Sequence, residues 1–184
     1  MKRVLGIESS CDECSASVLL AQPNHLEVSS VATFSQVKIH QPYGGVVPEI
    51  ASRNHLETIN LMIHQALAEA KTTLNQIDVI SVTNRPGLVG ALLVGVSAAK
   101  ALAYISKKPI IPVHHLEGHA VSVFLDQKEN FNKIQYPLLI AIISGGHTNL
   151  YLAKTPPENW GKNFLNESII GKSRDDAAGE AFDK

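Results

Sequence analysis

The histidines His115 and His119 are the first candidates for chemistry in this sequence, in the stretch His115-Leu-Glu-Gly-His119. Residues four apart lie on the same side of a helix, so both imidazoles can reach one metal ion. A catalytic divalent ion normally takes a third protein ligand and keeps an open position. The spacing therefore predicts part of a metal site, and the alternative is a pair of ordinary surface residues. Glu117, two residues from each histidine, does not share their face.

Three turns rich in small residues are the second candidates. They are Ser9-Ser10-Cys11-Asp12, Pro86-Gly87 and Ser144-Gly145-Gly146-His147-Thr148, each at the end of an expected strand. Such turns present backbone N–H groups that approach phosphates closely. Most glycine-containing turns have a structural role and bind no ligand, but two hairpin loops of this kind in one chain favour a nucleotide site.

The remaining chemistry-bearing residues indicate structural roles. Cys11 and Cys14 are the chain's two cysteines, which excludes a four-thiolate zinc site and a disulfide framework. Trp160 follows Pro156-Pro157 in a loop and is expected to pack rather than to bind a ligand. Three further histidines lack a partner at ligand spacing and are expected at the surface: His40, His55 and His64.

Strands that alternate with helices must position these residues. Strands are predicted at 3–10, 16–21, 28–36, 77–82, 109–113, 137–143 and 149–153. Helices are predicted at 49–71, 88–105 and 114–125, with another starting at Asp175. Helix 88–105 is apolar on most sides and is expected to be largely buried, with Gly90 and Gly95 against a sheet. This order indicates an α/β domain, in which the second hairpin opens another lobe.

Composition narrows the function classes. The 184 residues are 45% hydrophobic and 18% charged, with a net charge of -1. This balance argues against a DNA-coating or membrane-surface protein. A run of about 18 apolar residues is absent, and the apolar start is too short for a secretory signal, so a cytoplasmic protein without a membrane helix is expected.

The motifs in their order along the chain resemble the TsaD family. The matching stretches begin at Leu5 (LGIESSCDE), Tyr43 (YGGVVPEIASR), Pro86 (PGLVGALLVG), Pro112 (PVHHLEGH), Ser144 (SGGHT) and Asp175 (DDAAGEAFDK). The resemblance implies an α/β, actin-like ATPase fold of the sugar kinase, Hsp70 and ribonuclease H-like superfamily. Residues 1–135 would form the first lobe, and residues 136–184 the start of a truncated second lobe that closes with the first on a nucleotide.

The resemblance also implies a reaction. Family members transfer the threonylcarbamoyl group of threonylcarbamoyl-AMP to N6 of adenosine 37, next to the anticodon, in tRNAs that read codons beginning with A. It implies one divalent metal ion, Fe²⁺ or Zn²⁺, bound by His115 and His119, with Asp12 near the metal or phosphates in a catalytic role. The partners implied are tRNA, a TsaB-like paralogue and a TsaE-like ATPase. The adenylate-contacting residues implied are Ile142, Ile143, Ser144, Gly145, Gly146 and Asp183.

The sequence departs from the family pattern at two positions and in length. Arg85 stands where the family usually has Gly, and Cys14 where it usually has Thr. The chain stops at Lys184, whereas family members continue and supply an Asp as the third metal ligand. We therefore expect a fragment that binds metal weakly and is inactive alone.

The residue patterns leave three other functions open. A metallopeptidase would need the order His-Glu-x-x-His, which the His115–His119 stretch lacks. A non-catalytic actin-like scaffold of the TsaB type would lack the two metal histidines. A sugar or acetate kinase of the same superfamily would act on its substrate without any tRNA.

Overall fold

The computed structural model describes residues 1–22, 25–125, 134–146, 148–160, 164–174 and 177–179. The chain forms two compact units, Met1–His115 and Leu116–Lys184. This division follows the contacts within the chain, and the lobe boundary after residue 135 stays a prediction.

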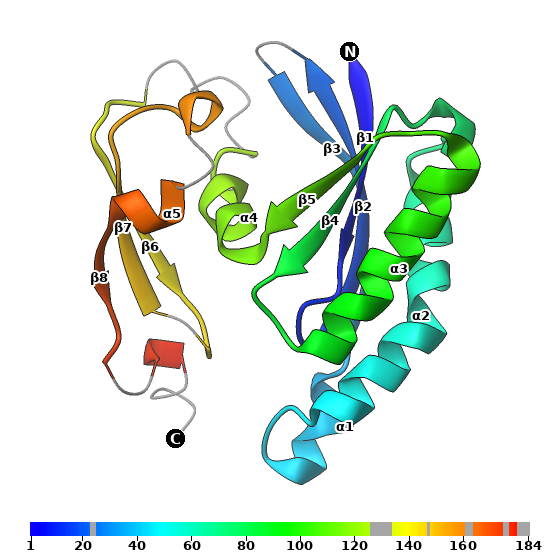
Figure 1. Cartoon of the computed structure of the whole chain (residues 1–184), viewed down its shortest axis with the longest axis horizontal. Helices are drawn as coiled ribbons and strands as arrows, with labels where there is room; N and C mark the ends of the chain where they lie inside the picture. The colour runs from blue at the N-terminus through cyan, green and yellow to red at the C-terminus, as the bar shows by residue number, and fades with distance from the viewer. Residues whose placement is uncertain (23–24, 126–133, 147, 161–163, 175–176, 180–184) are drawn as a thin grey trace. The chain divides into compact units, whose positions relative to one another are not determined.

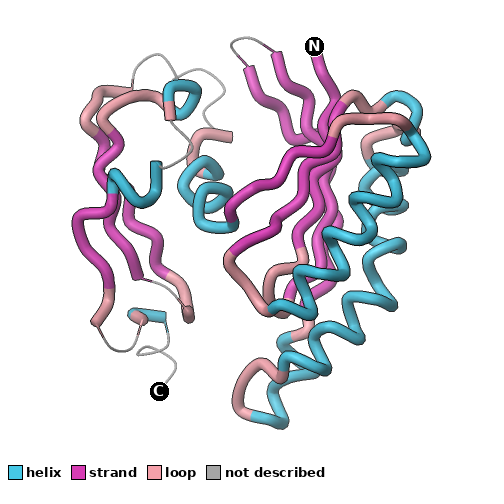
Figure 2. Tube along the Cα trace, viewed as in Figure 1, coloured by secondary structure: helices cyan, strands magenta, loops and turns pink. Residues whose placement is uncertain are grey.

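A five-stranded sheet forms the centre of the first unit (Figures 1 and 2). Its strands are β1 (Lys2–Glu8), β2 (Glu13–Gln22), β3 (His25–Ser35), β4 (Val79–Arg85) and β5 (Ile110–His114), in the spatial order β3-β2-β1-β4-β5. The first three strands pair antiparallel, whereas β4 and β5 run parallel to β1. Alternate residues such as Leu5 and Ile7 in β1 and Ala16 and Val18 in β2 are buried, because successive side chains of a strand point to opposite faces of the sheet.

The helices α2 (Pro48–Glu69) and α3 (Val89–Ser106) cover one face of this sheet (Figure 1). A short helix α1 (Val37–His40) and a 3₁₀ turn precede α2. Helix α2 begins with Pro48, one residue before the predicted start, because the missing N–H of proline is not needed in the first turn. Ile59, Met62 and Ile63 of α2 join the core of the sheet.

Helix α3 is less buried than the sequence predicted. Its buried face consists of Ala91, Val94, Gly95, Ala99 and Ala103, whereas Val89, Leu93, Tyr104 and Ile105 are exposed. Within the described residues, α3 is also the one helix whose length and hydropathy would suffice to cross a membrane. Its packing against β1, β4 and α2 is that of a helix covering a sheet.

Two glycines of α3 are sites of very close packing. A Cβ at Gly95 would lie 2.3 Å from Oγ of Ser9, the first residue after β1. The expected approach to the sheet is therefore confirmed for Gly95. Gly90 instead faces α2, because a Cβ there would lie 2.4 Å from Oγ of Ser52.

The second unit contains a small antiparallel sheet. Its strands are β6 (Leu138–Ile143), β7 (Thr148–Ala153) and β8 (Ile169–Lys172), in the order β6-β7-β8. Helix α4 (His115–Ser122) belongs to this unit from Leu116 onward, and the short helix α5 (Phe164–Ser168) precedes β8. Trp160 stacks on Phe164 with ring centroids 3.7 Å apart, so its predicted packing role is confirmed. Most of the predicted final helix lies outside the described residues.

Candidate functional site

Three parallel strands bring four polar residues together at one edge of the first sheet. Glu8 is the last residue of β1, Thr83 lies near the end of β4, and His115 directly follows β5. Since β1, β4 and β5 run parallel, their carboxyl ends meet at the same edge, where α/β proteins usually bind ligands. We call Glu8, Ser10, Thr83 and His115 the strand-end cluster.

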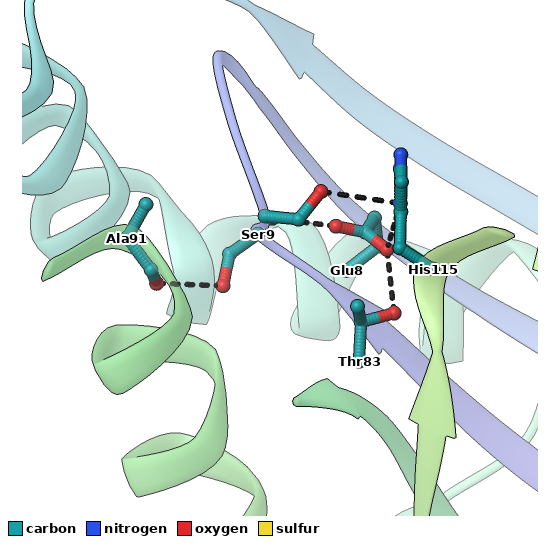
Figure 3. A network of polar contacts seen from close by, with 6 residues as sticks. Glu8, Ser9, Thr83, Ala91 and His115 are labelled. Atoms are coloured by element: carbon teal, nitrogen blue, oxygen red, sulfur yellow. Dashed lines mark hydrogen bonds and ion pairs between the residues drawn. The ribbon is translucent and has the colours of Figure 1, made fainter. Parts of the chain in front are cut away.

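The carboxylate of Glu8 is the centre of this cluster (Figure 3). One oxygen, Oε2, lies 3.2 Å from Nδ1 of His115 and accepts a hydrogen bond of 2.5 Å from the Thr83 hydroxyl. The other oxygen, Oε1, accepts a hydrogen bond of 2.5 Å from the backbone N–H of Ser10. Oγ of Ser10 also lies 3.2 Å from Nδ1 of His115. The cluster thus joins side chains that are up to 107 residues apart in the sequence.

These hydrogen bonds favour the ionised form of Glu8. Burial raises the pKa of Glu8, but the hydrogen bonds from His115, Ser10 and Thr83 outweigh it and lower the pKa from 4.5 to about 2. A carboxyl group whose pKa is lower in the folded than in the unfolded protein stabilises the fold at any pH above its unfolded pKa. This contribution is lost as the pH falls through the folded pKa. The relevant window lies between pH 4.5 and about 2.

We expect the free energy of unfolding to fall by at most about 3 kcal/mol across this window because of Glu8. Urea titrations at several pH values would measure it, with Glu8→Gln losing most of this acid dependence. Glu57→Gln, at an exposed position of α2, serves as the control and should keep the wild-type profile. Identical profiles for Glu8→Gln and wild type would contradict the prediction.

The turn after β1 is held by its backbone carbonyls. The carbonyl of Ser10 accepts from the N–H of Leu88, and that of Asp12 accepts from the N–H of Gln36. Between them, the carbonyl of Cys11 accepts a 2.8 Å hydrogen bond from Nε2 of His55. Three segments far apart in the sequence therefore fix three consecutive residues of the turn that the sequence singled out.

His40 and His55 are buried, whereas the sequence predicted both at the surface. His55 is fully buried on the sheet side of α2, and His40 is 3% exposed. His40 contacts Oε1 of Gln36 and accepts a hydrogen bond at Nδ1 from the backbone N–H of Val47. Both imidazoles form hydrogen bonds inside the fold, His55 with the Cys11 carbonyl and His40 with Gln36 and Val47, a role that ligand spacing cannot reveal. His64 is exposed as expected.

The two cysteines are free, with Cys14 buried in the core and Cys11 exposed. Partial burial of the thiol and the neighbouring charge of Asp12 raise the pKa of Cys11 from 9.0 to about 11. The thiolate is the reactive form, so Cys11 is a poor nucleophile at neutral pH despite its exposure.

We expect iodoacetamide to modify Cys11 at pH 8 about 10-fold more slowly than an unperturbed cysteine peptide. The raised pKa lowers the thiolate population by about 100-fold. A more basic thiolate is also more nucleophilic, which recovers about 10-fold of that loss. Asp12→Asn should speed the reaction because it removes the nearby charge. A Cys11 rate equal to that of the peptide, measured by mass spectrometry, would refute this.

The other predicted site residues lie in the following places. His119 is exposed in α4, at the predicted helical spacing from His115. Asp12 is half-buried in the turn after β1. Ile142 and Ile143 end β6, the first buried and the second 66% exposed. Gly145 and Gly146 follow in an exposed turn, and Asp183 lies outside the described residues.

Sequence reasoning did not assign Glu8 and Thr83 to a site. Both lie at the ends of apolar strands, and a polar residue at such a position is the signal that could have found them. Within the described ranges, no group of three or more His, Cys, Asp or Glu residues could hold a metal ion.

Comparison with known proteins adds an independent observation. Residues 27–184 match the sequence model of the TsaD family, described as tRNA N6-adenosine threonylcarbamoyltransferase. The chain belongs to this family. A TsaD relative of that description from Koribacter versatilis is 50% identical over 98% of the chain, and one from Syntrophomonas wolfei is 49% identical over 98%. These matches cover 46% and 49% of the two relatives, so the chain spans about half of their length.

Solved structures support the fold. YeaZ from Pseudomonas aeruginosa is similar with a TM-score of 0.53 over 96% of this chain and 67% of that chain. The two sequences are 16% identical, so this likeness concerns the fold alone. The mixed α/β architecture that the TsaD resemblance implied is confirmed.

Proposed function

We propose that the chain forms part of an enzyme that transfers the threonylcarbamoyl group from threonylcarbamoyl-AMP to N6 of adenosine 37 in tRNA. The observation that carries this proposal is the family match over residues 27–184, together with relatives that are 49–50% identical and described as this transferase. The strand-end cluster supports it, because it lies where α/β proteins usually bind ligands and includes one of the two predicted metal histidines.

We propose that His115 and His119 bind one divalent ion, Fe²⁺ or Zn²⁺. The residues present fit two ligands of such an ion. Nδ1 of His115 contacts Glu8 and Ser10, which directs the ring to bind through Nε2, and His119 follows four residues later in α4. The third ligand would come from outside the described residues. When bound, a divalent ion polarises a carbonyl oxygen as a Lewis acid.

The chain's own residues would position the adenylate. Ile142 to Gly146 would contact it, and the turn suits this role because a Cβ at Gly145 or Gly146 would meet no atom within 4 Å. We propose Asp183 as a further contact with the substrate and Asp12 as a catalytic residue near the metal or phosphates. No covalent nucleophile is needed, since the N6 amine attacks and AMP leaves.

The remaining parts of the proposal rest on the family. We propose an actin-like fold with the first lobe complete at 1–135 and the second, from 136 to 184, truncated. The partners would be tRNA, a TsaB-like paralogue and a TsaE-like ATPase, in the cytoplasm. This chain alone would bind metal weakly and would be inactive.

The test is restoration of threonylcarbamoyladenosine in cells that lack their own enzyme. The gene extended to its natural stop is supplied, and tRNA nucleosides are measured by mass spectrometry. We expect the modified nucleoside to return, and to be lost with His115→Ala but kept with His64→Ala, an exposed histidine of α2. Continued absence with soluble protein and its partners present would refute the proposal and favour a scaffold role.

A further inference from the structure

We propose that Glu8 is a positioning residue, which holds His115 in the Nδ1–H tautomer and so presents Nε2 of the ring as a ligand. The inference deepens the proposed metal role of His115. The expected effect of Glu8 on metal affinity rests on that role, whereas the contact between Glu8 and His115 does not. Glu8, Ser10, Thr83 and His115 all belong to the first unit and lie within the described residues.

The carboxylate of Glu8 accepts every hydrogen bond that it forms with Ser10 and Thr83. Its carboxylate receives a backbone N–H from Ser10 at Oε1 and the Thr83 hydroxyl at Oε2. An ionised carboxylate only accepts hydrogen bonds. The proton between Oε2 of Glu8 and Nδ1 of His115, 3.2 Å apart, therefore belongs to the imidazole. In the neutral ring the lone pair is then on Nε2.

Two neighbouring segments hold the carboxylate of Glu8 in place. Glu8 ends β1, Thr83 lies on the adjacent parallel strand β4, and the backbone N–H of Ser10 comes from the fixed turn. The carboxylate is thus fixed by two contacts that do not involve His115. Figure 3 shows the second nitrogen of the His115 ring directed away from Glu8. A carboxylate that orients a ligating histidine in this way typically contributes 10–100-fold to metal affinity.

Two buried histidines of the same unit provide internal references. Nδ1 of His40 accepts the N–H of Val47, and Nε2 of His55 lies 2.8 Å from the Cys11 carbonyl, which only accepts. Both rings must therefore carry a proton on Nε2. The structure thus assigns opposite tautomers to His115 and to these two rings, which one spectrum can compare.

The experiment is ¹⁵N NMR of histidine-labelled, metal-free protein expressed from the gene extended to its natural stop, with His115→Ala to assign the signal. We expect the Nδ1–H form for His115 and the Nε2–H form for His40 and His55. Glu8→Gln should change the His115 signal alone to a tautomer mixture, because an amide can also donate to Nδ1. Thr83→Val should keep the Nδ1–H form, because the carboxylate remains. An Nε2–H signal for His115 in the wild type, or an unchanged signal in Glu8→Gln, would overturn the inference.

A second readout separates this inference from the proposed function. Zn²⁺ titration of the same proteins should give 10–100-fold weaker binding for Glu8→Gln and wild-type affinity for His64→Ala. If the tautomers behave as expected but no variant binds Zn²⁺, the proposed metal role fails and the positioning of His115 stands. If Zn²⁺ binds equally to wild type and Glu8→Gln, Glu8 does not position a ligand.

Discussion

Replacing Gly95 by alanine is expected to lower the free energy of unfolding by about 2–4 kcal/mol. The new Cβ would lie 2.3 Å from Oγ of Ser9, far inside van der Waals contact. Ser9 is fully buried, and its hydroxyl donates a 2.8 Å hydrogen bond to the carbonyl of Ala91 (Figure 3). Either this hydroxyl rotates and loses its partner inside the core, or α3 moves away from β1.

A double-mutant cycle with Ser9→Ala tests this mechanism by chemical denaturation. Without Oγ, the nearest atom of residue 9 to the new Cβ is its own Cβ at 3.4 Å, which is tolerable. Gly95→Ala should therefore cost much less in the Ser9→Ala background, giving a coupling of about 1–3 kcal/mol. Gly118→Ala in α4 is the matched control, because its Cβ would meet nothing within 4 Å and alanine favours the helix. Equal costs in both backgrounds would exclude the clash with Ser9.

Replacing His55 by alanine is expected to lower the free energy of unfolding by about 3 kcal/mol. The change leaves a cavity between α2 and the sheet, and it removes the donor that satisfies the Cys11 carbonyl. The turn after β1 should then loosen, which gives a second effect beyond stability. Hydrogen exchange at the N–H groups of residues 10–13 should be faster in the variant than in the wild type.

His64→Ala is the control for His55, because both histidines belong to α2 and His64 is exposed. This variant should change stability by less than about 0.5 kcal/mol and leave hydrogen exchange in the turn unaltered. Equal effects of the two substitutions would mean that the contact between His55 and the Cys11 carbonyl has no energetic importance.

The long elements could be predicted from the sequence because their apolar periods are unambiguous. The period of α2 and the apolar runs of β1, β4 and β5 place each element within a few residues. Strand β8 was missed because Ile169-Ile-Gly-Lys172 is too short to show a period. The exposed face of α3 was missed because a helix that is apolar on most sides does not reveal which side meets the sheet.

The candidate site could be predicted only where its residues are neighbours in the sequence. The pair His115 and His119 and the small-residue turns show local spacing, so the sequence could suggest them, and their role in a site stays a prediction. The contact between Glu8 and His115 depends on strand order, which places β1, β4 and β5 side by side. The buried His55 likewise depends on a carbonyl 44 residues away, and no local pattern marks that pairing.

The position of β1 between β2 and β4 has a consequence for the protein as it leaves the ribosome. The hairpin partner of β1 is synthesised immediately, but its parallel partner β4 starts only at Val79. At roughly 5–20 residues per second, one hydrogen-bonding edge of an apolar strand stays open for several seconds. We expect the nascent chain to need protection of that edge until β4 emerges, since open strand edges recruit other chains.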